Sequence, residues 1–125
     1  MVFTAAGQGL LVAASGYEGD KGRLVQWNLL YNGTNYYLAN ANYLTNTHER
    51  TRRPFGIAYD DGADTVMVVW RNASSNRSMS HCTKTSFGAS TRCGAPATAV
   101  SQVVNGVNLA YDPPNNVFTA AFSYE

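Results

Sequence analysis

Charged residues are scarce in this chain of 125 residues, at 14% of the sequence against about a quarter in an average globular protein. The formal net charge is +1, and only Lys21 and Lys84 are lysines. Nucleic-acid binding draws on Lys and Arg clustered over a whole face of a protein. Nucleic acid is therefore not an expected partner.

Long hydrophobic runs are missing as well. No apolar stretch approaches the roughly 18 residues that a membrane-spanning helix needs, so no membrane span is expected. The first residues lack the charged-then-apolar pattern of a secretory signal. No stretch combines helical periodicity with capping residues, which leaves strands as the expected elements.

Motifs of catalysis and cofactor binding are also absent. The sequence has no Gly-x-Ser-x-Gly and no glycine-rich phosphate loop. His48 and His81 are too isolated to form a metal site, and neither cysteine has another at Cys-x-x-Cys spacing, so a zinc site is not supported. We expect no cofactor, and the sequence leans away from an enzyme without excluding one.

What the sequence does contain is a recurring strand pair. Residues 54–71 hold an apolar run ending in Tyr59, an Asp- and Gly-rich turn, and a β-branched run ending in Trp70 and Arg71. Residues 107–122 repeat that order around Tyr111. Each segment therefore predicts an antiparallel hairpin.

The hairpins recur at a regular distance. Position 65 aligns with position 117, an offset of 52, and residues 10–18 align with residues 117–125. Periods of about 40 to 50 residues with four strands each are typical of propeller blades. We expect an all-β fold of tandem four-stranded antiparallel repeats, β-propeller-like with about two and a half blades. The expected repeats are 2–53, 54–105 and 106–125, and a two-sheet β-sandwich is the alternative.

The segments between the hairpins are less certain in their alignment. An Asn-Gly turn at 32–33 predicts a hairpin over residues 22–41, but the stretch around it also resembles the recurring hairpin. Residues 78–83 predict a third strand of the middle repeat, and residues around 97–104 predict a fourth. Two and a half blades cannot close on themselves, so we expect a homo-oligomer, or part of a larger chain or assembly.

The hairpin pattern, with Arg53-Pro54 just upstream, resembles the repeats of secreted bacterial β-propeller proteins. Those repeats carry a Tyr-Asp-Gly-Thr-Asn-Tyr-like hairpin, to whose first half residues 31–36 are similar, followed by an apolar strand ending in Trp. The resemblance covers about half of the chain, and Phe122 stands where the Trp is expected. It implies an architecture shared by surface proteins, lectins and some glycosidases, and it identifies no catalytic residue.

Two cysteines indicate an oxidising compartment. Cys82 and Cys93 are spaced as neighbouring strands of a hairpin would place them, which suits a disulfide. Asn-x-Ser/Thr sequons at Asn32, Asn72 and Asn76 and the scarcity of lysine point the same way. We expect an extracellular or periplasmic, secreted protein.

Aromatic and arginine residues are the candidate ligand-binding groups. Aromatic rings near strand ends can stack on sugars, and Arg guanidinium groups can bind a carboxylate such as that of a sialic acid. The alternative for the aromatic residues is packing in the core, which is favoured for Trp70. The alternative for the arginines is a solvated loop, which is favoured as well. The candidate ligand-binding residues are Tyr17, Tyr43, Arg50, Arg53, Trp70 and Arg71.

Asp60, Asp61 and Asp64 place three carboxylates within five residues on a turn. Calcium takes several oxygens from a flexible loop, but Asp and Gly are also the residues that turns select. The turn is the favoured interpretation, and no metal is predicted. The sequence as a whole predicts a non-enzymatic extracellular binding or surface-structural module, with carbohydrate as the first ligand to test. The alternative is a fragment of a sialidase-like glycoside hydrolase.

Overall fold

The computed structural model describes residues 1–46, 49–73, 79–89, 91–100 and 104–124. One 3₁₀ turn, Glu18–Asp20, lies among strands, and no α-helix occurs in these ranges. The strands are β1 (Val2–Phe3), β2 (Gly9–Ala14), β3 (Leu24–Tyr31), β4 (Tyr36–Tyr43), β5 (Gly56–Asp60), β6 (Thr65–Arg71), β7 (Met79–Thr85), β8 (Ala97–Val100), β9 (Val104–Asp112) and β10 (Val117–Tyr124).

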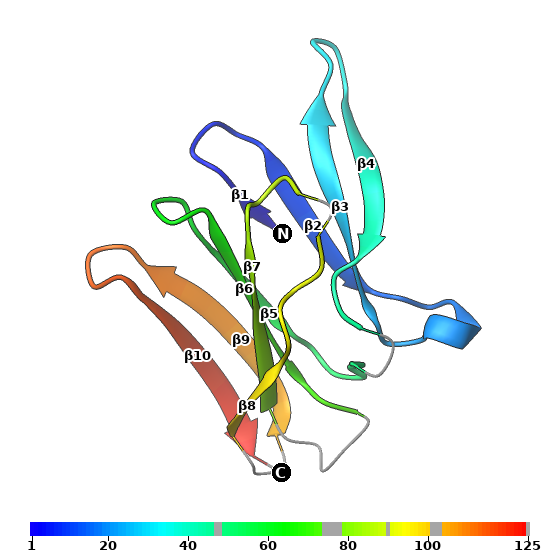
Figure 1. Ribbon diagram of the computed structural model, residues 1–125, viewed down its shortest axis with the longest axis vertical. Helices are drawn as coiled ribbons and strands as arrows, with labels where there is room; N and C mark the ends of the chain where they lie inside the picture. The colour runs from blue at the N-terminus through cyan, green and yellow to red at the C-terminus, as the bar shows by residue number, and fades with distance from the viewer. Residues whose placement is uncertain (47–48, 74–78, 90, 101–103, 125) are drawn as a thin grey trace.

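These strands form three antiparallel sheets, each built in chain order. The first sheet is β1-β2-β3-β4, the middle sheet is β5-β6-β7-β8, and β9 pairs with β10. Figure 1 shows the sheets following one another across the molecule. The expected all-β, antiparallel fold is confirmed. Three sheets are present where a sandwich has two, and none of the described sheets closes on itself.

The first hydrophobic core lies between the first sheet and the middle sheet. Leu10 and Leu24 come from the first sheet, and Val66, Val68 and Trp70 come from β6. Alternate residues of β6 point to this side because side chains along a strand alternate between its two faces. All five are at most 1% exposed, and each buried side chain of this size contributes about 1.5–3 kcal/mol.

The second core lies on the opposite face of the middle sheet. Val69 and Met79 pack there against Val107 of β9, with Phe122 of β10 partly buried beside them. β5 and β9 approach so closely that a Cβ added to Gly56 would lie 2.6 Å from the backbone nitrogen of Leu109. The middle sheet is therefore covered on both faces.

The recurring hairpins have the same local geometry. The Tyr59 hydroxyl donates a hydrogen bond to Asp64 Oδ1 across the β5–β6 turn (2.9 Å), and the Tyr111 hydroxyl donates to Asn116 Oδ1 across the β9–β10 turn (2.7 Å). Asp64 and Asn116, 52 positions apart, both have positive φ. The Asn-Gly hairpin is β3–β4 and forms the last two strands of its sheet, whereas the recurring hairpins form the first two.

Some boundaries differ from the sequence prediction. The expected fourth strand of 97–104 divides into β8 and the first residue of β9, with residues 101–103 outside the described chain. The start of β9 at Val104 also precedes the expected repeat boundary at 106. Residue 78 of the expected third strand likewise lies outside the described residues. No helix in the described residues has the length and apolarity needed to cross a bilayer.

The predicted disulfide is present. Cys82 on β7 is bonded to Cys93 in the β7–β8 connection, with 5.6 Å between the two Cα atoms. Of the sequons, Asn32 is exposed on the β3–β4 turn. Asn72 is buried, and its amide donates to Glu49 Oε2 (3.3 Å), so this side chain is not presented for glycosylation. Asn76 lies outside the described residues.

Candidate functional site

A groove of about 600 Å³ lies where the β2–β3 turn meets the segment that leads into β5. Gly22 makes this contact possible, because its φ is +88° and a Cβ there would lie 2.5 Å from the Thr51 carbonyl oxygen. The Thr51 amide donates to the Gly22 carbonyl (2.8 Å) and holds the two segments together. The groove is thus formed by residues far apart in the sequence.

The groove combines positive charge with an aromatic wall. Lys21, Arg52 and Arg53 line it and are exposed, and the half-buried Phe55 lines it from the start of β5. None of the described residues that line the groove is acidic. The groove can therefore attract an anionic group and pack an apolar surface beside it.

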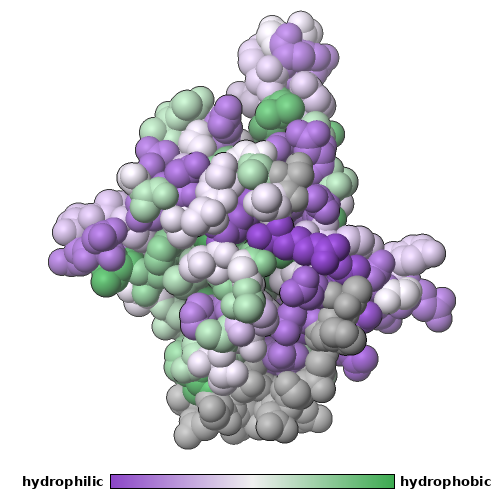
Figure 2. Space-filling view, viewed as in Figure 1, coloured by the Kyte–Doolittle hydropathy of each residue, from purple (hydrophilic) through white to green (hydrophobic). Residues whose placement is uncertain are grey.

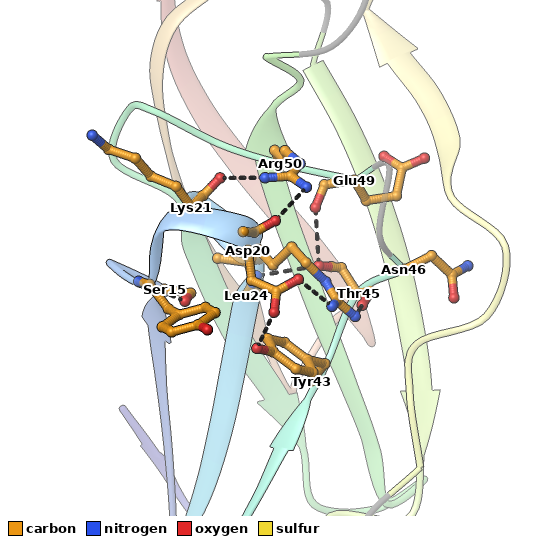
Figure 3. A network of polar contacts seen from close by, with 12 residues as sticks. Ser15, Asp20, Lys21, Leu24, Tyr43, Thr45, Asn46, Glu49 and Arg50 are labelled. Atoms are coloured by element: carbon orange, nitrogen blue, oxygen red, sulfur yellow. Dashed lines mark hydrogen bonds and ion pairs between the residues drawn. The ribbon is translucent and has the colours of Figure 1, made fainter.

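A network of polar contacts supports one wall of the groove (Figure 3). The Arg23 guanidinium donates to Asp20 Oδ1 (2.7 Å) and lies 3.6 Å from the centre of the Tyr43 ring. The Tyr43 hydroxyl donates to Asp20 Oδ2 (2.5 Å). This hydrogen bond from Tyr43, with the Arg23 guanidinium, lowers the pKa of the Asp20 carboxyl below its usual range.

Arg50 ties the same turn to the segment that follows β4. Its guanidinium donates to the carbonyl oxygens of Lys21 and Gly19 (3.1 Å each), as Figure 3 shows for Lys21. Tyr17, at the other end of the turn, is 74% exposed. The structure therefore gathers Tyr17, Tyr43 and Arg50 around the Glu18–Asp20 turn, with Arg53 in the adjoining groove.

The other two candidate ligand-binding residues lie elsewhere. Trp70 is 1% exposed and packs in the first core, and Arg71 is 6% exposed at the end of β6. Trp70 shares its face of β6 with Val66 and Val68, which explains why its ring is enclosed. Neither side chain is presented to a ligand at the surface, so we leave both out of the candidate site.

The three turn carboxylates accept hydrogen bonds within the fold. Asp60 Oδ1 accepts from the Gly62 and Ala63 amides (2.9 and 3.1 Å), as Asp residues in turns commonly do. Asp64 Oδ1 accepts from Tyr59 and from the Phe87 amide (2.9 Å each), and Asp61 Oδ1 from the Ala5 amide (3.4 Å). Within the described ranges, no three His, Cys, Asp or Glu residues gather so as to hold a metal ion.

Sequence reasoning missed the buried cation Lys84. Its ammonium donates to Gln26 Oε1 (2.7 Å) and to the carbonyl oxygens of Phe87 and Ala89. The residue is 1% exposed, and burial lowers its pKa to about 8. The available signal was the two-residue alternation of β7, which places Lys84 on the same face as Cys82.

Asp20 and Arg23 were missed for a different reason. In the sequence Asp20 stands beside Lys21 in a polar stretch, but its partner Tyr43 lies at the end of β4, and only the β3–β4 pairing brings the two side chains together. Comparison with known proteins adds nothing to this geometry, because no family model, curated protein or solved structure matches the chain.

Proposed function

We propose that this chain is a non-enzymatic, extracellular carbohydrate-binding module built from propeller-like blades. Its ligand is a glycan bearing a carboxylate or sulfate group, held in the groove beside the β2–β3 turn. The observation that carries the proposal is the groove itself, which joins Lys21, Arg52 and Arg53 with Phe55 and contains no acidic residue among its described lining.

The arrangement of the sheets supports the propeller-like part of the proposal. Each four-stranded sheet is a simple meander, as propeller blades are. The first strands of the three sheets are neighbours, since β1 contacts β5 and β5 contacts β9. The Cys82–Cys93 disulfide supports a location outside the cytosol.

The chemistry of the groove supports an acidic sugar over a neutral one. Arg binds carboxylate and sulfate groups through paired hydrogen bonds, and a nearby ammonium adds charge. Aromatic rings pack against the apolar face of a sugar. Tyr17 offers such a ring, because it is 74% exposed and its amide donates to Ser15 Oγ (3.2 Å) on the groove wall.

A sialidase-like glycoside hydrolase is the alternative, and the groove lends it less support. Glycoside hydrolysis generally uses two carboxyl groups that flank the scissile bond. The described residues that line the groove include no carboxylate, and Asp20 nearby is paired with Arg23 and Tyr43. Binding without turnover is therefore the favoured function.

The test is calorimetric titration with sialylated, uronic-acid-containing, sulfated and neutral oligosaccharides. Arg52→Gln should weaken binding of the acidic glycans about tenfold, the equivalent of about 1.4 kcal/mol. Arg92→Gln is the matched control, because Arg92 is exposed and donates to Asn46 outside the groove. If the folded protein binds no glycan, or releases products from one, the proposal is wrong.

A further inference from the structure

The first sheet has one face that the described fold leaves uncovered. Leu10 and Val12 point toward the middle sheet and are buried. Leu11 alternates with them and pairs with Trp27, while Phe3, Gly9, Leu29 and Leu38 form a row across all four strands. We call the face formed by Phe3, Leu11, Trp27, Leu29 and Leu38 the outer face of the first sheet.

This outer face is apolar but exposed. Phe3 is 54% and Leu38 48% exposed, and Leu11, Trp27 and Leu29 are only partly buried. The middle sheet and β9–β10 lie on the opposite side of the first sheet (Figure 1). The β3–β4 hairpin projects beyond them, with hydrophilic residues at its tip (Figure 2). A contiguous apolar surface of this kind marks an interaction site.

The far side of β9–β10 is a second sheet face that none of the described residues covers. Ala110 pairs with Thr119, and Asn108 pairs with Ala121. All four are exposed, and they alternate with Leu109, Ala120 and Phe122, which pack toward the middle sheet. We call the face formed by Asn108, Ala110, Thr119 and Ala121 the outer face of β9–β10. Its small side chains leave room for large ones opposite.

The packing within the chain shows how such faces meet. The even-numbered side of β6, with Val66 and Val68, receives the first sheet, and the odd-numbered side, with Val69, receives β9–β10. With the 52-residue offset, Val66 and Val68 correspond to Phe118 and Ala120 of β10. Ala120 packs toward the preceding sheet, and Phe118, two positions earlier, shares its face of the strand. The same stacking relation is thus used twice in one chain.

We infer that the outer face of the first sheet is covered by the outer face of β9–β10 of a second copy, head to tail. If the first sheet of a second copy packs on β9–β10 as β9–β10 packs on the middle sheet, these two faces meet. Ala110, Thr119 and Ala121 then lie over Leu11 and Trp27 of the second copy. Such a contact is heterologous, so successive copies form a closed ring or an open chain. The inference rests on the proposed stacking of blades and is independent of glycan binding.

Analytical ultracentrifugation of the 125-residue chain over a wide concentration range tests the inference. The wild type should sediment as a multiple of the monomer mass. A head variant, Leu11→Glu, and a tail variant, Thr119→Arg with Ala121→Arg, should each be monomeric. Mixed in equal amounts they should form a heterodimer of twice the monomer mass, because one intact head and one intact tail remain.

Two outcomes would overturn the inference. A wild-type chain that stays monomeric at the highest concentration means that another part of a longer protein, or nothing, covers this face. A tail variant that still dimerises means that two first sheets pair face to face instead. Circular dichroism and melting curves report whether each variant folds, and Phe3→Glu at a more exposed position replaces Leu11→Glu if that variant does not. Loss of glycan binding alone leaves these masses unchanged.

Discussion

Lys84 Nζ on β7 lies 2.7 Å from Gln26 Oε1 on β3, so a cation of the middle sheet is hydrogen-bonded to the first sheet inside the protein. Both residues are 1% exposed. A buried ammonium loses its hydration, and the hydrogen bonds it makes must offset that loss. The contact therefore links the packing of two sheets to the protonation of one side chain.

The first prediction concerns stability in mild alkali. Burial lowers the pKa of Lys84 in the folded state to about 8 from its ordinary 10.5. Between these values the unfolded chain binds more protons than the folded one, so stability rises with pH. We expect a gain of about 2 kcal/mol between pH of roughly 7.5 and 9.5, measured by urea denaturation.

Lys84→Met is the variant that isolates this effect. It should remove the rise in stability over this pH range, because Met fills similar volume without a titrating group. Lys21→Met, at an exposed position, is the matched control and should keep the rise. A wild type whose unfolding free energy is flat over the range would contradict the prediction. The range ends at about pH 9.5 because tyrosines of the unfolded chain ionise mainly from about pH 10 upward. Burial raises the pKa of Tyr59 in the folded state, so its ionisation in the unfolded chain would lower the stability and mask the effect of Lys84.

The second prediction concerns the two equivalent hairpins. Tyr59→Phe removes the hydrogen bond to Asp64, and Tyr111→Phe removes the one to Asn116. Each substitution should lower the free energy of unfolding by about 1 kcal/mol, as measured by chemical denaturation. Tyr36→Phe, on a ring that is 67% exposed, serves as the control and should change little. Equal results for all three variants would show that these turn hydrogen bonds contribute nothing.

The third prediction concerns the Cys82–Cys93 bond. It closes a loop with a sequence separation of 11. Reduction should lower the free energy of unfolding by about 3 kcal/mol, because it restores entropy to the unfolded chain. Melting curves with and without a reductant measure the difference. A Cys82→Ala, Cys93→Ala double variant should melt at one temperature under both conditions, and a shift in that variant would expose an effect of the reductant itself.

The sequence predicts the strand pairs well where turn chemistry and strand pattern agree. Tyr59, the Asp-rich turn and the β-branched run up to Trp70 predict the β5–β6 hairpin, and the structure confirms it. Core packing of Trp70 is favoured from the sequence and confirmed by the structure, but the sheet that covers its ring is not predicted. Alternation along a strand says which residues share a face, but not what covers that face.

The candidate site is less predictable for a related reason. Arg50 stands close to Arg52 and Arg53 in the sequence, yet it donates to the carbonyl oxygens of Gly19 and Lys21, about thirty positions earlier. A contact between a side chain and a backbone carbonyl cannot be predicted from the pattern of side chains, because every residue carries a backbone carbonyl. Lys84 was missed as well, because a buried lysine depends on acceptors such as Gln26 that only the stacking of two sheets brings near.

The fourth prediction links the groove to a single glycine. Gly22 and Gly33 both have positive φ, +88° and +93°, so the backbone strain of an alanine at either position should lower the free energy of unfolding by a similar amount, about 1 kcal/mol. A Cβ at Gly33 meets no atom within 4 Å, whereas one at Gly22 would lie 2.5 Å from the Thr51 carbonyl oxygen. Gly22→Ala should therefore destabilise the protein more than Gly33→Ala does.

The same pair of variants tests whether the proposed glycan groove depends on this contact. Gly22→Ala pushes Thr51 and its neighbours Arg52 and Arg53 away from the β2–β3 turn, so it should weaken binding of acidic glycans by tenfold or more, about 1.4 kcal/mol. Gly33→Ala should bind as the wild type does. Calorimetry on both variants, with melting curves to confirm folding, measures the difference. Equal affinities would mean that the glycan binds elsewhere, because a displaced segment cannot hold its cations in place.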